Sequence, residues 1–304
     1  MSFSVNASIV ISGVVAESTP LLFAASGEYM AERGGTLNIS IEGMMLAGAF
    51  TGVAVASATT NLILGLLAGV AAGLLIAAIH ANFSHRLAAN TFVVGLTLDA
   101  LVLGATDYFA TVLKPGAAKF TPVTIPLLSK IPAVGTSIFV QPWPFYLLIV
   151  VIPLTWWAIE RTNWGLEVRA SGENPSAADA TGIRVNVRRR QALYLCGVLS
   201  GLGGAFLSLC IVGAFNFDMT AGIGFVVLAA VIFGGWTLRG AVFGALLFGA
   251  ASAMGLVLPT LGTSVNPQLL LALPYLLALA AMSFLAKSHR SPRALAQPFT
   301  RGIS

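Results

Sequence analysis

The feature that most constrains this chain is a series of uncharged apolar runs, each close to twenty residues long. Residues 61–80, 145–159 and 269–286 read NLILGLLAGVAAGLLIAAIH, FYLLIVVIPLTWWAI and LLLALPYLLALAAMSFLA. A helix needs about 20 apolar residues to cross roughly 30 Å of hydrocarbon. Of the 304 residues, 57% are hydrophobic and only 9% are charged, too few polar side chains to cover a soluble domain of this size. We therefore expect a polytopic α-helical membrane protein.

The hydropathy pattern divides the chain into nine apolar segments within one transmembrane domain covering residues 1–304. The segments are 7–31, 41–58, 61–80, 90–113, 143–160, 190–214, 222–236, 240–258 and 267–286. The expected fold class is all-α, a bundle of about nine spans, some of them broken or re-entrant. Glycines four residues apart let helix backbones approach closely in lipid. They occur at Gly65, Gly69 and Gly73, at Gly197 and Gly201, and at Gly240 and Gly244.

Basic residues indicate how the bundle is oriented. Six arginines fall within 161–190, and more basic residues fall in the tail 287–304. Cytoplasmic loops carry the excess of lysine and arginine, so both regions are predicted to be cytoplasmic. Counting spans then places the N-terminus outside and the C-terminus inside, with the loop 114–142 outside despite its three lysines. The net charge of +5 is explained by these loops and indicates no nucleic-acid partner.

Two interruptions of the apolar pattern share the letters G-G-(x)-T-L. Residues 31–42 read AERGGTLNISIE after a span that Pro20 is expected to break, and residues 234–238 read GGWTL within the stretch 222–250. Paired, glycine-interrupted segments in two halves of a transporter mark a binding site between internal repeats. The pattern indicates an internal repeat, and the alternative is that four shared letters arise by chance.

Polar side chains near these interruptions are the candidates for a translocation pathway. Asn38 and Glu42 are four residues apart, so on a helix they would share one face that lines a polar path. The alternative is that both are caps at the cytoplasmic mouth of the next span. Glu32 and Arg33 are interpreted as a simple interfacial ion pair. Phe225 and Trp236, beside the second interruption, would supply faces for stacking.

The stretch GENPSAADATGI, residues 172–183, predicts a short helix in the cytoplasmic loop. Asn174 and Pro175 favour a turn and a helix start, and Gly182 favours a C-terminal cap. A small, alanine-rich helix between two spans suits docking in a groove of another protein. The alternative is a solvated linker.

No constellation for covalent chemistry is visible. The dipeptide Gly-Lys of a phosphate-binding loop is absent, and the three histidines lack metal-ligand spacing. Cys196 and Cys210 are fourteen residues apart in one predicted span, about 21 Å along a helix and beyond disulfide reach. The chain is therefore not expected to be an enzyme, to bind a metal or to need a cofactor of its own.

Three stretches resemble the permease subunits of ABC importers that handle simple sugars, nucleosides and branched-chain amino acids. GENPSAADATGI is similar to the cytoplasmic loop of that family, and ERGGTLNISIEGMMLAGAF (residues 32–50) resembles its nucleoside-type members. AAVIFGGWTLRGAVFGALLFG (residues 229–249) resembles a third block, except that Leu238 and Arg239 stand where a nearby proline is expected. The similarity extends over most of residues 10–285.

The resemblance implies a transport subunit of a bacterial plasma (inner) membrane, importing nucleosides or nucleobases. It implies three partners: a cytoplasmic ATPase that hydrolyses ATP, a second and longer permease, and an external substrate-binding protein. The loop at 172–183 would be the coupling helix that contacts the ATPase, through Gly172, Glu173, Asn174, Ala177, Ala178 and Gly182. The alternatives are import of simple sugars or another small solute, or an ion-coupled secondary transporter.

Overall fold

In the computed structural model the chain is largely helical, and the structure describes residues 3–131, 134–260, 269, 272–277, 280 and 291–300. Seven helical stretches of this part are long and apolar enough to cross a membrane. They contain α1 (Phe3–Arg33), α2 (Ile41–Thr59), α3 (Leu62–His85), α4 (Thr91–Leu113), α6 (Leu148–Arg161), α9 (Val185–Phe206) and α11 (Leu238–Thr260). A shorter apolar helix, α10 (Ile223–Phe233), occupies the segment expected at 222–236. The all-α polytopic bundle is thus confirmed, while the segment expected at 267–286 lies largely outside the described residues.

The first span is not broken at Pro20, contrary to the sequence-based expectation. Helix α1 continues through this proline for 31 residues. Proline removes one backbone hydrogen bond, but neighbouring helices and hydroxyl side chains compensate for this inside membrane proteins. The adjacent Thr19 hydroxyl donates to the carbonyl oxygen of Val15 at 2.6 Å, one residue before Ala16, whose carbonyl loses its N–H partner at Pro20. The interruption comes at the end of α1 instead.

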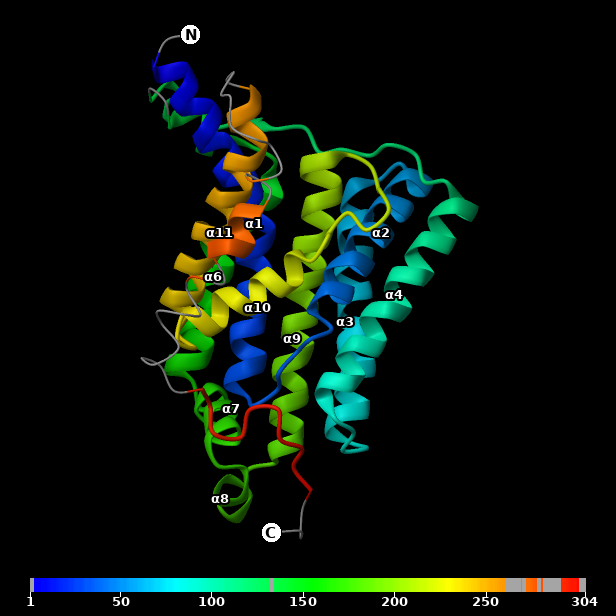
Figure 1. Cartoon of the computed structure of the whole chain (residues 1–304), viewed down its shortest axis with the longest axis vertical. Coiled ribbons are helices and arrows are strands. Elements are labelled where there is room, and N and C mark those ends of the chain that lie inside the picture. Colours follow the sequence, from blue (N-terminus) through cyan, green and yellow to red (C-terminus); the bar gives the residue numbers. More distant parts are fainter. Residues whose placement is uncertain are drawn as a thin grey trace.

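Gly34 and Gly35 end α1 and turn the chain back into the bundle. Gly35 has φ of 92°, a left-handed conformation that glycine adopts without steric strain. Residues 36–38 form no regular structure, and the chain rises from the end of α1 to the start of α2 (Figure 1). Because of this return, α2 begins part-way along the bundle. The first predicted interruption is confirmed, and it is re-entrant.

The second predicted interruption, at Gly234 and Gly235, separates α10 from α11. Trp236 follows with a left-handed φ of 53°, and α11 begins two residues later. The Thr237 hydroxyl accepts a hydrogen bond from the Gly240 N–H, which caps the start of α11. The Trp236 indole N–H donates to Glu32 Oε2 at the end of α1. The two interruptions, two hundred residues apart in sequence, are therefore in direct contact.

Helices α2, α3 and α9 pack with their backbones touching. A Cβ atom added at Gly69 would lie 2.7 Å from the carbonyl oxygen of Gly48 on α2. One added at Gly73 would lie 2.7 Å from the Cα of Gly201 on α9. No side chain fits at such separations, so these positions require glycine. The expected role of the four-residue glycine spacing on α3 and α9 is confirmed.

The loop 114–142 folds against the end of α9. It contains β1 (Val123–Thr124), η1 (Leu128–Lys130), α5 (Gly135–Phe139) and β2 (Val140–Gln141), and β1 and β2 pair antiparallel. Next follows η2 (Trp143–Leu147), which leads into α6. The Phe120 N–H donates to the carbonyl oxygen of Leu209, and its ring packs edge-on against Trp143. Leu209 lies in η3 (Leu207–Val212), a π-helical turn that continues α9, so the loop covers this end of the helix.

Two short helices lie at the opposite end of the bundle, α7 (Asn163–Glu173) and α8 (Pro175–Ala180). Residues 291–300, red in Figure 1, lie beside them. We call this the α8 end of the molecule.

Candidate functional site

Glu42 holds the N-terminus of the short helix α10 from inside the bundle. Its Oε1 accepts from the Gly222 N–H at 2.9 Å and its Oε2 from the Gly224 N–H at 2.6 Å. The first N–H groups of a helix have no partner within the helix, and the helix dipole favours a carboxylate there. Glu42 is only 8% exposed. It therefore supplies, from α2, the cap that α10 lacks in its own sequence.

Asp99 on α4 does the same for α2. Its Oδ1 accepts from the Gly43 N–H, in the first turn of α2, at 2.7 Å. Two helices that begin inside the bundle are thus each capped by a carboxylate from a neighbouring helix. Reasoning from the sequence missed Asp99, although an acidic residue inside an apolar span is costly in lipid and signals a specific partner.

Asn38 belongs to a different environment from Glu42. It precedes α2 in the irregular segment, so the two residues do not share a helix face, and that expectation was wrong. Its amide nitrogen donates to Glu28 Oε2 on α1 at 2.9 Å, and its Oδ1 accepts from the Ser40 hydroxyl at 2.9 Å. Its amide also lies 3.3 Å from Cys196 Sγ on α9. Asn38 is fully buried, so in this structure it ties the re-entrant segment to α1 and α9.

Two histidines extend this buried polar network to α3 and α4. His80 is within hydrogen-bond distance of Ser40 through Nδ1, at 2.6 Å, and of Thr91 through Nε2, at 2.8 Å. His85 Nε2 lies 2.8 Å from the Thr36 hydroxyl. Among the described residues, no three His, Cys, Asp or Glu side chains are grouped to hold a metal ion. The histidines therefore bind the re-entrant segment to its neighbours.

The two aromatic candidates, Trp236 and Phe225, differ in exposure and in their contacts. Trp236 is 8% exposed and bonded to Glu32, so its ring packs within the bundle. Phe225 is 43% exposed and lies on the first turn of α10, next to the turn that Glu42 caps. The expected pairing of Glu32 with Arg33 was wrong, because Glu32 is fully buried and its partner is the Trp236 indole.

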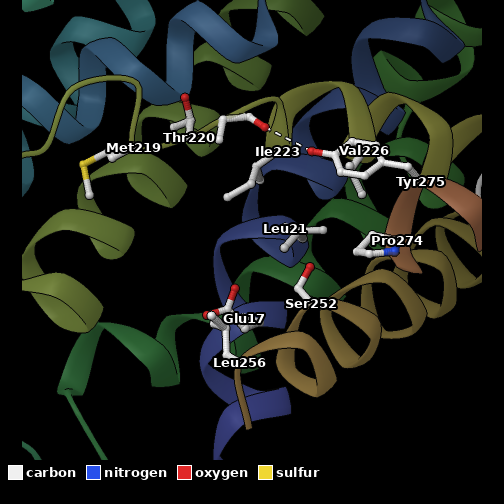
Figure 2. A pocket seen from close by; sticks show the side chains of 11 residues that line it. Glu17, Leu21, Met219, Thr220, Ile223, Val226, Ser252, Leu256, Pro274 and Tyr275 are labelled. Carbon is white, nitrogen blue, oxygen red and sulfur yellow. Dashed lines mark hydrogen bonds between the residues drawn. The ribbon is translucent and has the colours of Figure 1, made fainter. Parts of the chain in front are cut away.

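A cavity of about 190 Å³ lies between α1, the turn before α10, and α11 (Figure 2). Eleven residues line it, and four carry polar side-chain groups: Glu17, Thr220, Ser252 and Tyr275. Glu17 projects from α1 and Ser252 from α11 (Figure 2), while the Tyr275 hydroxyl donates to the carbonyl oxygen of Ala221 at 3.2 Å. The other seven lining residues are apolar. Because one wall is the turn before α10, the cavity is directly next to the part of the chain that Glu42 holds.

The loop predicted to dock on a partner contains the expected capped helix. Asn174 Oδ1 accepts from the Ala177 N–H at 3.0 Å, and Gly182 has φ of 90° just after α8. Glu173, Asn174, Ala177 and Gly182 are exposed, whereas Gly172 is buried against the end of α1. Ala178 is only 4% exposed and faces inward. Of the two adjacent alanines, Ala177 is therefore the one available for docking.

Comparison with known proteins identifies relatives over nearly the whole chain. The family described as branched-chain amino acid transport system / permease component matches residues 10–282. A nucleoside ABC transporter permease protein (NupC) of Lactococcus lactis is 36% identical, over 82% of each chain. A guanosine ABC transporter permease protein (NupQ) of Bacillus subtilis is 33% identical, over 97% of each chain. A Haloferax volcanii chain provisionally named a glucose ABC transporter permease protein is 32% identical, over 99% of each chain.

Proposed function

Because this chain belongs to the family of branched-chain amino acid transport system / permease components, we propose that it is the permease of an ATP-driven importer of nucleosides or nucleobases. The observation that carries the cargo assignment is its 33–36% identity to two permeases named for nucleosides and guanosine. Glucose is the second candidate, supported by the relative from Haloferax volcanii. The chain is a multi-pass membrane protein, with seven helical stretches suited to crossing the bilayer.

The composition of the cavity favours a nucleoside or nucleobase over a sugar. Seven of its eleven lining residues are apolar, and Tyr275 adds an aromatic ring. A flat base fits between apolar walls, and stacking on an aromatic side chain contributes about 1–3 kcal/mol per base. A hexose instead exposes hydroxyls on most of its edge, and each buried hydroxyl without a partner costs about 1–3 kcal/mol. The few polar groups, at Glu17, Thr220 and Ser252, suit the N–H and hydroxyl groups of a nucleoside.

Cargo would pass beside the turn before α10. Glu42 and Phe225 are the pathway candidates nearest this turn: Glu42 holds it in place and Phe225 presents an exposed ring. Asn38 and Trp236 act in this proposal by supporting the two chain interruptions rather than by touching cargo. A permease needs weak contacts, since cargo must leave as readily as it enters.

The α8 end would face the cytoplasm and dock on the ATPase. This end carries Arg169, Arg188 and Arg189, consistent with the excess of positive charge in cytoplasmic loops. The exposed face of α8 offers small side chains and defined caps for the coupling contact. The second permease would complete the pore, and a binding protein would deliver cargo at the other end, where the loop 114–142 lies.

The test is uptake of labelled nucleosides, nucleobases, glucose and leucine by cells that express the whole system. We expect ATP-dependent uptake of nucleosides or nucleobases. Glu17→Gln should reduce it, whereas Asp107→Asn, at an exposed carboxylate on α4, should not. Uptake of glucose or leucine without nucleosides would refute the cargo assignment and leave the permease assignment standing.

A further inference from the structure

Residues 291–300 form a non-helical strap across the α8 end of the bundle (Figure 1). The Ala294 N–H donates to the carbonyl oxygen of Gly172, at the end of α7, at 2.9 Å. The Ala296 N–H donates to the carbonyl oxygen of Gly35, in the first chain interruption, at 3.1 Å. Ala294 is 4% exposed, so the strap is packed into the protein. It connects two segments that are far apart in the sequence.

Arg189 on α9 holds the same junction together from inside. It is fully buried, and its guanidinium donates to backbone carbonyls instead of a carboxylate. Nη2 donates to Ser171 at 2.9 Å and Nη1 donates to Gln297 of the strap at 2.6 Å. The carbonyl of Ala294 lies 3.5 Å from Nη2. Of its carbonyl partners among the described residues, only Ser171 lies outside the strap, so the strap and Arg189 depend on each other.

The end of α7 also contacts the first interruption directly. A Cβ atom added at Gly172 would lie 3.0 Å from the backbone nitrogen of Gly35 and would overlap the carbonyl oxygen of Arg33. Helix α8 begins three residues after Gly172, at Pro175. The docking helix is therefore joined to the interruption through α7, and the strap is bonded to both sides of the joint.

From this junction, a continuous set of contacts leads to the cavity. The re-entrant segment 36–40 follows Gly35 and leads into α2. There, Glu42 binds the N–H groups of Gly222 and Gly224. The turn before α10 is a wall of the cavity. A shift of the first interruption relative to α9 would thus move the wall of the cavity. The movement would pass along the chain from Gly35 to Glu42, and from Glu42 through two hydrogen bonds to the turn before α10.

We propose that the strap is a positioning element that couples α8 to the re-entrant segment, so that movement imposed on α8 also moves the first interruption. This rests on the proposed function, because it assumes that an ATPase acts at α8. With the strap in place, α7 and Gly35 move as one body. With the strap displaced, only the direct packing of Gly172 on Gly35 joins α7 to the first interruption, so movement of α8 is transmitted less completely and less cargo moves for each ATP hydrolysed.

The test is Ala294→Trp in the assembled transporter, compared with Ser291→Trp. The first adds an indole at a buried strap position, and the second adds the same side chain at an exposed one. The measurements are ATPase co-purification, ATP hydrolysis stimulated by the loaded binding protein, and cargo uptake in proteoliposomes. We expect Ala294→Trp to retain the ATPase and its hydrolysis while cargo moved per ATP falls about two- to thirtyfold, the range that corresponds to a change of about 0.5–2 kcal/mol in coupling energy. Ser291→Trp should match the unmodified protein.

Truncation after residue 290 is the second variant, and it should show the same loss of coupling. An unchanged ratio of cargo to ATP in a variant with the strap displaced would overturn the proposal. Loss of assembly in both Ala294→Trp and the truncation would also overturn it, since the strap would then serve assembly alone. Failure of the unmodified transporter to move nucleosides would count against the cargo assignment, and not against the strap.

Discussion

Glu42→Gln is the most informative single substitution, because the Glu42 carboxylate has a defined role in the structure: it caps the start of α10. Both of its oxygens accept a backbone N–H at the start of α10, at 2.9 and 2.6 Å. A glutamine can offer an oxygen to only one of these donors and must turn its NH₂ group toward the other. A buried donor left without a partner costs about 1–3 kcal/mol. We expect a loss of that size in the stability of the purified protein, together with slower uptake.

Asp99→Asn is the matched control for this prediction. Asp99 uses only one oxygen, Oδ1, on the Gly43 N–H, and its Oδ2 has no hydrogen-bond partner among the described residues. An asparagine can therefore keep its carbonyl oxygen on Gly43, and its NH₂ group replaces an oxygen that is already buried without a hydrogen-bond partner, so no existing hydrogen bond is lost. Thermal unfolding in detergent should show a smaller loss for Asp99→Asn than for Glu42→Gln. Equal losses would refute the capping argument and indicate that removal of charge alone decides the outcome.

Three further predictions concern the exposed face of α8, a glycine contact between helices, and the orientation of the bundle. Ala177→Arg should abolish ATPase co-purification while Ala177→Ser retains it, since the exposed face of α8 needs small side chains; binding retained by the arginine variant would show that α8 is not the contact. Gly73→Val should destabilise the bundle by about 3 kcal/mol or more, since its backbone touches α9. The same change should be tolerated at Gly104, where an added Cβ would have no atom of another described segment within 4 Å, and equal unfolding temperatures for the two variants would contradict this. A cysteine at Ser176 should be labelled only from the cytoplasm, and one at Ala117 only from outside. The reverse pattern would show that the predicted orientation of the bundle is wrong.

The sequence alone determined which parts of the chain are helices in the bundle and where two of them are interrupted. The length of an apolar run is a local property of the sequence. The bounds of α3 and α4 are therefore within about five residues of the expected 61–80 and 90–113. Of the three Gly-Gly pairs, 34–35 and 234–235 do interrupt the helices, whereas 203–204 lies inside α9, where close helix packing requires small residues. Pro20 misled the prediction because the cost of one lost backbone hydrogen bond depends on the helices packed around it, which the sequence does not show.

Only the tertiary structure decided which polar residues meet. Glu42 is four residues from Asn38, yet its partners are Gly222 and Gly224, while Asn38 joins Glu28 on α1. Side-chain partners across helices depend on how the helices are rotated and how deep each one starts. Because α2 begins part-way along the bundle, its residues meet different neighbours than they would if it began at the end. The spacing of residues in the sequence does not reveal the depth at which the helix starts. For the same reason the arginine count indicated an orientation, but it did not reveal that Arg189 is buried beneath a strap from the tail. Local sequence patterns predict where the helices lie. Which polar residues bind one another across helices is determined only when those residues are buried together in the folded bundle.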